Sequence, residues 1–281
     1  MNNKKHFLAM PYVFWSVIFT VVPLITIVVY SFSGRDAFGD IVYEFSLDNY
    51  KMFFTPIYMN VLWRSIKLSV YSTAICLILG YPMAYIIANA KGAKQNLMVM
   101  LFIVPLWTNF LLRTYAWMGL LRDQGIINEI LMGIGLINEP IQMLYTSGAV
   151  MLGMVYNYLP FMVLPIYSIL VKIDTSLLEA ARDMGANEFQ VFTKVLFPLS
   201  FPGVATGIIM TFMPAVSTFV ISDLLGGGQT ILLGNLIQNQ FMAARNWQFG
   251  SAVSVLMMLM LVASMGYFVK NSSKDGGGRL W

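Results

Sequence analysis

Residues that could perform chemistry are scarce in this chain of 281 residues. The single histidine, His6, lies near the N-terminus, and the single cysteine, Cys76, lies inside an apolar run. Nucleophilic catalysis needs a nucleophile held beside a base, and a metal ion needs a cluster of ligands. The sequence shows neither set, and it shows no G-x-x-x-x-G-K-[S/T] phosphate loop. It therefore predicts no catalytic residue, no metal site and no cofactor.

The residues best suited to bind another molecule form a charged segment between two apolar runs, 140–171 and 195–222. Glu179 and Asp183 are four residues apart, so on a helix they form an unfavourable like-charge pair. Arg182 can compensate one of them, which leaves the other for a partner. The two alanines between them are small enough for a partner's backbone to approach closely. The segment reads Glu179-Ala180-Ala181-Arg182-Asp183-Met184-Gly185.

This charged segment, with its flanks, predicts two short helices joined by a turn. Asp174, Thr175 and Ser176 can cap the first helix, which is expected to run to about Met184, and Gly185 supplies the left-handed turn that ends it. Asn187 can cap the second helix, with Gln190 at the reciprocal third position. Pro198 is expected to end the second helix, because the residue before a proline avoids helical geometry. Each helix has an apolar face, formed by Leu177, Ala181 and Met184 on the first and by Phe189, Phe192 and Leu196 on the second.

Two helices joined by a turn can also read DNA, but the charges of this segment disfavour contact with phosphates. Three acids outnumber the two basic residues: Glu179, Asp183 and Glu188 against Arg182 and Lys194. We therefore expect no nucleic-acid partner.

The apolar runs predict a protein embedded in a lipid bilayer. The chain is 58% hydrophobic and 11% charged, whereas soluble domains carry about 25% charged residues. The stretch 224–244 is too polar to cross and fits an amphipathic helix at the membrane interface. A helical span needs about 20 mostly apolar residues. Six spans are expected, at about 8–32, 68–90, 97–121, 146–171, 203–224 and 249–269.

These spans predict an all-α fold in which residues 1–281 form one domain that contains the loop 173–202. The positive-inside rule sets the orientation. With both termini inside, the outer segments hold six basic residues. The inner segments hold ten: Lys4, Lys5, Lys91, Lys94, Lys172, Arg182, Lys194, Lys270, Lys274 and Arg279. Both termini and the loop 173–202 are therefore expected in the cytoplasm.

The spacing of Glu179-Ala180-Ala181, Gly185 and Pro198 resembles the cytoplasmic coupling loop of ABC-importer permeases. Further segments resemble the permease subunits of spermidine/putrescine importers, more closely the first of the two permeases of such a system. The similarity covers nearly the whole chain. These segments are Gly80-Tyr81-Pro82-Met83-Ala84-Tyr85, Ile103-Val104-Pro105-Leu106-Trp107-Thr108-Asn109, Leu159-Pro160-Phe161-Met162-Val163-Leu164-Pro165, Ser222-Asp223-Leu224-Leu225-Gly226-Gly227 and Asn246-Trp247-Gln248-Phe249-Gly250.

The resemblance implies a non-catalytic permease subunit in a bacterial inner membrane. Its implied partners are a second permease in a heterodimer, two ATPase subunits, an extracytoplasmic binding protein and the lipid bilayer, with a polyamine as substrate. ATP hydrolysis would belong to the separate ATPase. The residues expected to couple to the ATPase are Glu179, Ala180, Ala181, Asp183, Gly185 and Pro198.

Candidates for the substrate pathway lie within the spans. One face of the fifth span is expected to carry Phe212, Val216, Phe219 and Asp223. Ammonium groups are attracted by carboxylates and by aromatic ring faces, by about 0.5–2 kcal/mol per ring. A structural role for Asp223, as a helix cap or a partner of Arg245, is the alternative. The predicted pathway residues are Trp107, Tyr115, Trp117, Tyr156, Phe219 and Asp223.

Arg113 is an ionisable residue at membrane depth, where charge is costly and usually faces protein or water. It is expected to share a face of the third span with Asn109 and Trp117. A cation there would repel a polyamine. Arg113 is therefore expected either in a structural pair or near the outer mouth.

Two alternative functions remain open from the sequence. One is an ABC permease for another small solute. The other is an ion-coupled secondary transporter, which would need carboxylates within its spans, and only Asp223 lies near one.

Overall fold

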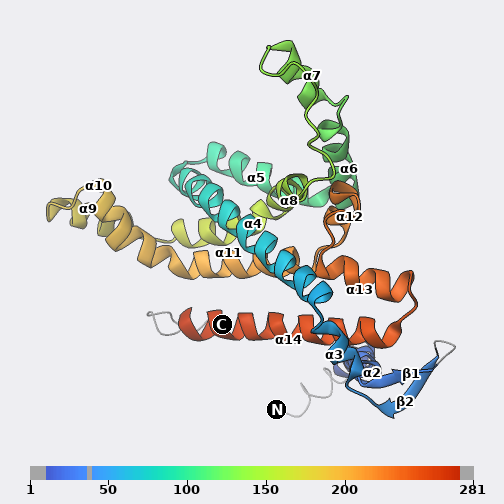
Figure 1. Cartoon of the computed structure of the whole chain (residues 1–281). Coiled ribbons are helices and arrows are strands. Elements are labelled where there is room, and N and C mark those ends of the chain that lie inside the picture. Colours follow the sequence, from blue (N-terminus) through green and yellow to red (C-terminus); the bar gives the residue numbers. More distant parts are fainter. Residues whose placement is uncertain (1–10, 37–39, 273–281) are drawn as a thin grey trace, which may run out of the picture. The chain divides into compact units, whose positions relative to one another are not determined.

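The computed structural model describes residues 11–36 and 40–272, and most of these are helical (Figure 1). His6 and residues 8–10 of the first expected span lie outside the described residues. Ala93–Trp107 and Phe110–Gly133 are together long and apolar enough to cross a membrane, but the chain bends by 96° between them. Five helices are long and apolar enough to cross a membrane: Pro11–Ser31, Pro56–Asn89, Ser147–Leu170, Glu188–Ser217 and Trp247–Gly266. The predicted multi-pass helical protein is therefore confirmed at the level of five spans, or six with the bent pair.

The chain folds into two compact units, one formed by Met1–Leu62 with Leu233–Val262 and the other by Trp63–Leu232 with Ala263–Trp281. The elements of the first unit are η1 (Val17–Val21), α2 (Val22–Ser31), β1 (Ser33–Arg35), β2 (Ile41–Phe45), α3 (Asp48–Phe53), the start of α4 (Pro56–Asn89), α13 (Leu233–Met242) and most of α14 (Trp247–Ser272). The second unit continues α4 and adds α5 (Ala93–Trp107), α6 (Phe110–Leu121), α7 (Ile126–Gly133), α8 (Ser147–Leu170), α9 (Thr175–Asp183), α10 (Glu188–Val191), η2 (Phe192–Leu196), α11 (Phe197–Ser217) and α12 (Val220–Gly226).

The first unit contains an antiparallel hairpin of β1 and β2, so the all-α prediction is wrong in this detail. Tertiary hydrogen bonds hold the hairpin. The buried amide of Gln248 donates to the carbonyls of Gly34 and Asp40 at 3.2 and 3.4 Å. The amide of Asn49 donates to the Ser33 carbonyl at 2.9 Å. The donors lie far along the chain from their acceptors, so the local sequence pattern did not reveal the hairpin.

Three of the expected spans differ from the observed helices. Helix α4 begins at Pro56 rather than near 68, so it is about 51 Å long, well beyond the roughly 30 Å of a hydrocarbon layer. The third span breaks between α5 and α6, where Thr108 is extended and the Asn109 side chain caps α6 by accepting from the Leu111 N–H at 2.8 Å. The fifth span ends at Ser217, because Thr218 is extended and α12 starts anew.

The packed centre of the second unit is the pair α8 and α11. Glycines let their backbones approach, as is common between membrane helices. A Cβ added at Gly207 would lie 2.8 Å from the Met162 sulfur, and one added at Gly203 would lie 2.9 Å from the Pro165 carbonyl oxygen. The interior of this unit is therefore set by close backbone contact as much as by large side chains.

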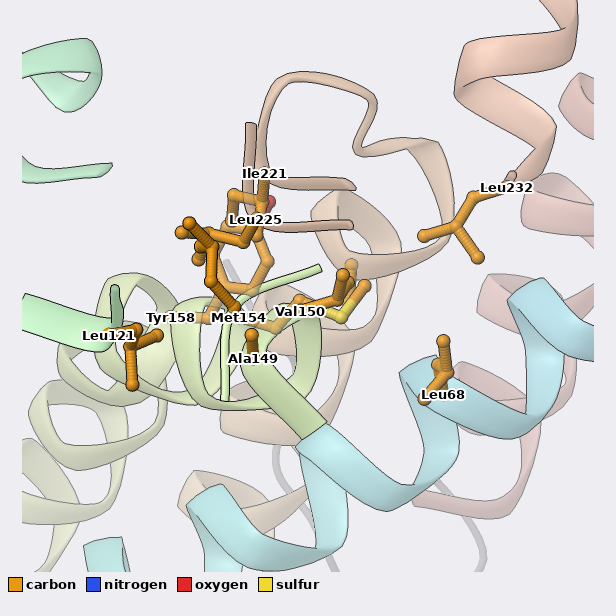
Figure 2. Packing of buried hydrophobic residues seen from close by; sticks show 11 residues of the cluster. Leu68, Leu121, Ala149, Val150, Met154, Tyr158, Ile221, Leu225 and Leu232 are labelled. Atoms are coloured by element: carbon orange, nitrogen blue, oxygen red, sulfur yellow. The ribbon is translucent and has the colours of Figure 1, made fainter. Parts of the chain in front are cut away.

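A second cluster joins α8 to α12, with further residues from α4 and α6. Figure 2 shows Val150 and Met154 of α8 beside Ile221 and Leu225 of α12. All four side chains are fully buried. Gly153 lies between these two layers, and a Cβ there would meet Leu225 Cδ1 at 2.5 Å and Ile221 Cγ2 at 2.9 Å. The position of α12 on α8 thus depends on the absence of a side chain at residue 153.

Replacing Gly153 with leucine is expected to destabilise the second unit. Overpacking of a close-packed interior costs about 1–3 kcal/mol. Thermal unfolding of the purified protein in detergent measures the loss. Gly119→Leu on α6 is the matched control, because a Cβ there meets no atom within 4 Å. Equal unfolding temperatures for the two variants would contradict the packing described here.

Candidate functional site

The first helix of the charged loop has the ends that the sequence predicts. The Asp174 carboxylate accepts from the Ser176 N–H at 2.9 Å, and this bond lowers the pKa of the carboxyl group. The helix, α9, ends at Asp183 with Met184 as its C-cap, and Gly185 follows with φ of +87°. A left-handed backbone is strained for residues with a Cβ. The predicted glycine turn is therefore confirmed.

The second helix begins with the predicted reciprocal cap. The Asn187 side chain accepts from the Gln190 N–H at 2.9 Å, and the Gln190 side chain accepts from the Asn187 N–H at 3.1 Å. Two backbone donors at the start of α10 are thereby satisfied. We call α9, α10 and their connecting turn, residues 174–191, the coupling hairpin.

The prediction that Pro198 ends the second helix is wrong. Phe197, the residue before it, is helical with φ −63° and ψ −47°, and α10 continues through η2 into α11. Within η2 the Phe197 N–H donates to the Phe192 carbonyl, which is the i to i−5 bond of a π-turn. Pro198 is the second residue of α11 and follows this π-turn directly.

Arg182 forms an ion pair across the glycine turn instead of within α9. Its Nε donates to Glu188 Oε1 at 2.7 Å and its Nη2 donates to Oε2 at 3.1 Å. The pair lowers the pKa of Glu188 and raises that of Arg182. Glu179 also raises the pKa of Arg182, but less than Glu188 does. The expected compensation within α9 is therefore the weaker of the two interactions of Arg182. Glu179 and Asp183 are both exposed.

The apolar residues of the loop divide between the interior and the surface. Ala181, Val191 and Leu196 are buried. Leu177, Met184 and Phe189 are 50%, 83% and 74% exposed, respectively. In Figure 1 the coupling hairpin lies at the end of η2 and α11, and α9 and α10 project from the body of their unit. Exposed apolar side chains next to exposed acids form a surface suited to another protein.

The predicted pathway residues are only partly brought together. The rings of Trp117 on α6 and Tyr156 on α8 are in edge contact, with centroids 5.4 Å apart. Phe219 precedes α12 and Asp223 lies one turn further, with its N–H donating to the Phe219 carbonyl at 2.9 Å. Helix α12 packs against both α6 and α8. Trp117, Tyr156 and Asp223 therefore lie on three elements that pack against one another.

The other pathway candidates are separated from this group by breaks in the helices. Trp107 is the last residue of α5 and is 78% exposed. Tyr115 lies on α6 beyond the 96° bend and is also exposed. Phe212 lies on α11, so the predicted common face with Asp223 is wrong, because the chain changes direction at Thr218. Spacing along the sequence was misleading at both breaks.

Arg113 is half-buried on α6, and its Nε has no hydrogen-bond partner within the described part of the chain. Asn109 caps the helix that carries it. Among residues 11–36 and 40–272, no three His, Cys, Asp or Glu side chains are close enough to hold a metal ion.

Comparison with known proteins places these features in a family. A family described as "Binding-protein-dependent transport system inner membrane component" matches residues 77–275. The chain is 40% identical over 273 residues to the spermidine/putrescine transport system permease protein PotB of Haemophilus influenzae, covering 96% of each chain. It is 41% identical over 247 residues to PotB of Escherichia coli, covering 88% of this chain and 90% of that one.

A solved structure has the same fold at low sequence identity. It is a bacterial ABC transporter involved in the import of the acidic polysaccharide alginate, with a TM-score of 0.76 and 16% identity. The match covers 96% of this chain and 94% of that chain. The sequence and structural similarities extend over nearly the whole chain. The chain therefore belongs to the binding-protein-dependent transport system inner membrane components, the multi-pass permease subunits of ABC importers.

Proposed function

We propose that this chain is the permease subunit of an ATP-driven importer for spermidine and putrescine. The observation that carries the proposal is the 40% identity to PotB of Haemophilus influenzae over 96% of both chains. Such a subunit is not itself an enzyme. It forms part of the path through the bacterial inner membrane, and a separate ATPase hydrolyses ATP.

In this proposal the coupling hairpin is the surface that docks the ATPase. Leu177, Met184 and Phe189 supply apolar contact area, and Glu179 and Asp183 supply charge. The Arg182–Glu188 pair ties α9 to α10 across the turn. Ala180 is exposed and small, so a partner's backbone can approach α9 there. Gly185 fixes the angle between the helices, and Pro198 lies in the first turn of α11, which η2 connects to the hairpin.

The proposed topology has six spans and both termini in the cytoplasm. Helices α5 and α6 then form one broken span, and irregular backbone at membrane depth is tolerated where it faces protein or a water-filled path. The proposed assembly contains a second permease as a heterodimeric partner, two ATPase subunits and an extracytoplasmic binding protein. The α6, α8 and α12 group with Trp117, Tyr156, Phe219 and Asp223 is the proposed part of the pathway, together with Trp107 and Tyr115.

Uptake by the purified complex tests the function. The chain is reconstituted with its second permease, ATPase and binding protein, and uptake of radiolabelled spermidine is measured. Uptake should require ATP and survive collapse of ion gradients. An ion-coupled secondary transporter would show the reverse. Direct ligand binding to the partner binding protein distinguishes polyamines from another small solute.

Replacing Gly185 with valine is expected to abolish ATP-dependent uptake while the subunit still inserts into the membrane. A β-branched residue strongly disfavours the φ of +87° observed there, so the angle between α9 and α10 must change. Co-purification of the ATPase and uptake of spermidine are the measurements. Gly185→Asn is the matched control, because asparagine tolerates the left-handed region and should retain most uptake. Normal uptake by the valine variant would contradict the role of the turn.

Replacing Asp223 with asparagine is expected to lower polyamine uptake about 10- to 150-fold without loss of assembly. The change preserves size and removes the charge, and a charge-assisted hydrogen bond contributes about 1.5–3 kcal/mol. Uptake of labelled spermidine is measured alongside co-purification of all subunits. Wild-type uptake would remove Asp223 from the pathway. Loss of assembly would instead assign it a structural role.

A further inference from the structure

Tyr81, which the mechanism proposed above does not use, joins the base of the coupling hairpin to α4. It lies on α4 and is 8% exposed. Its ring meets that of Phe192 edge-on, with centroids 5.6 Å apart, and meets that of Phe197 at 5.9 Å. Its hydroxyl lies 2.8 Å from the Ser200 hydroxyl. One side chain of α4 therefore contacts both ends of the π-turn η2 and the first turns of α11.

The direction of the hydrogen bonds follows from the number of hydroxyl protons. Ser200 donates its one proton to the Phe197 carbonyl at 3.0 Å. The Ser200 oxygen can then only accept from Tyr81. The chain of bonds runs from the Tyr81 hydroxyl through Ser200 to the backbone of Phe197. A buried chain of this kind, with every proton used, favours one geometry.

The π-turn is what presents both aromatic rings to Tyr81. In an ordinary α-helix, residues five apart are rotated by about 140° around the axis, so they point in different directions. In η2 the Phe197 N–H bonds to the Phe192 carbonyl, which places the two residues nearly one above the other. Their ring centroids are 6.1 Å apart. The extra residue in the turn thus builds an aromatic pair that Tyr81 completes.

Helix α4 also approaches α8 closely next to Tyr81, at Gly80. A Cβ added at Gly80 would lie 3.0 Å from Met162 Cγ, and the same methionine lies against Gly207 of α11. Movement of α4 near Gly80 is therefore resisted by α8. A displacement of Tyr81 is thus transmitted to the packed pair α8 and α11.

We propose that Tyr81, Phe192, Phe197 and Ser200 form a latch that transmits movement of the coupling hairpin to α4, with Tyr81 as a positioning residue. This inference rests on the proposed function, because the movement would come from the ATPase docked on the hairpin. The latch does not touch substrate. It makes α4 and the base of the hairpin move as one body.

The test removes the Tyr81 hydroxyl and preserves the ring. In the reconstituted complex, Tyr81→Phe should leave subunit co-purification and thermal stability close to wild type. Spermidine uptake per ATP hydrolysed should fall about 2- to 12-fold, the effect of one lost neutral hydrogen bond. Ser200→Ala should lower this ratio at least as much, because it also removes the bond to the Phe197 carbonyl. The double variant should be no worse than Ser200→Ala, since both single changes remove the bond between Tyr81 and Ser200.

Tyr167→Phe is the matched control. Tyr167 lies on α8, packs against the same buried cluster, and its hydroxyl makes no hydrogen bond within the described part of the chain. This variant should keep the wild-type ratio of uptake to hydrolysis. A wild-type ratio for Tyr81→Phe would overturn the latch. So would a fall that merely follows loss of assembly or thermal stability, because that outcome indicates a structural role.

A second measurement separates the latch from the choice of substrate. Amide hydrogen exchange in residues 77–85 of α4 is compared in the ATPase-bound complex with and without ATP. ATP should change this exchange in the wild type, and in Tyr81→Phe the change should be confined to the coupling hairpin. If wild-type complex takes up no spermidine but exchange behaves in this way, the substrate assignment fails and the latch stands. If no ATPase binds the hairpin, both proposals fail.

Discussion

In the hydrocarbon layer of a membrane no water is available to pair backbone N–H and C=O groups, so each must be satisfied within the protein. This constraint explains why the long apolar runs of the chain are helices, and it makes every interruption of a helix informative. At Asn109 a side chain caps the helix that resumes after the bend. At Phe192–Leu196 the helix widens into a π-turn and does not break, so the chain passes through Pro198 in helical geometry.

The packing of the second unit follows from the same setting. Lipid tails are as apolar as leucine, so helices associate through close fit more than through burial from water. Gly153, Gly203 and Gly207 lie where α8 meets α12 and α11, and a Cβ at any of them would meet a neighbouring atom within 3 Å. Helix α8 is thereby held on two sides. On a third side of α8, the ring of Tyr156 contacts the ring of Trp117 on α6.

The coupling hairpin has a different balance of forces because α9 and the glycine turn lie outside the apolar spans, and only α10 is continuous with one of them. Its internal bonds are caps, a glycine turn and one exposed ion pair, and exposed pairs of this kind contribute little to stability. Such a small element keeps its shape through local geometry. At its base, Leu196 belongs to a buried cluster with residues of α4 and α8, and Leu178 of α9 packs against that cluster. A coupling hairpin of fixed local geometry, joined to buried side chains where η2 begins, can transmit a displacement to the helices of the second unit.

Local features of this protein were readable from the sequence alone. The caps at Asp174 and Asn187 and the turn at Gly185 depend on residues within a few positions of one another, so their types determined them. The length and composition of the apolar runs determined that the chain is a helical membrane protein. The order of residues in the segment from Glu179 to Gly185 indicated its family.

Tertiary structure decided the remaining features. These are the breaks near Asn109 and Thr218, the β-hairpin, the Arg182–Glu188 pair and the π-turn at Phe192. Each depends on a contact with a distant residue or on a change of backbone direction, which periodicity along one helix does not contain. The same holds for Tyr81, because its contacts with Phe192, Phe197 and Ser200 exist only where α4 packs against the base of the hairpin.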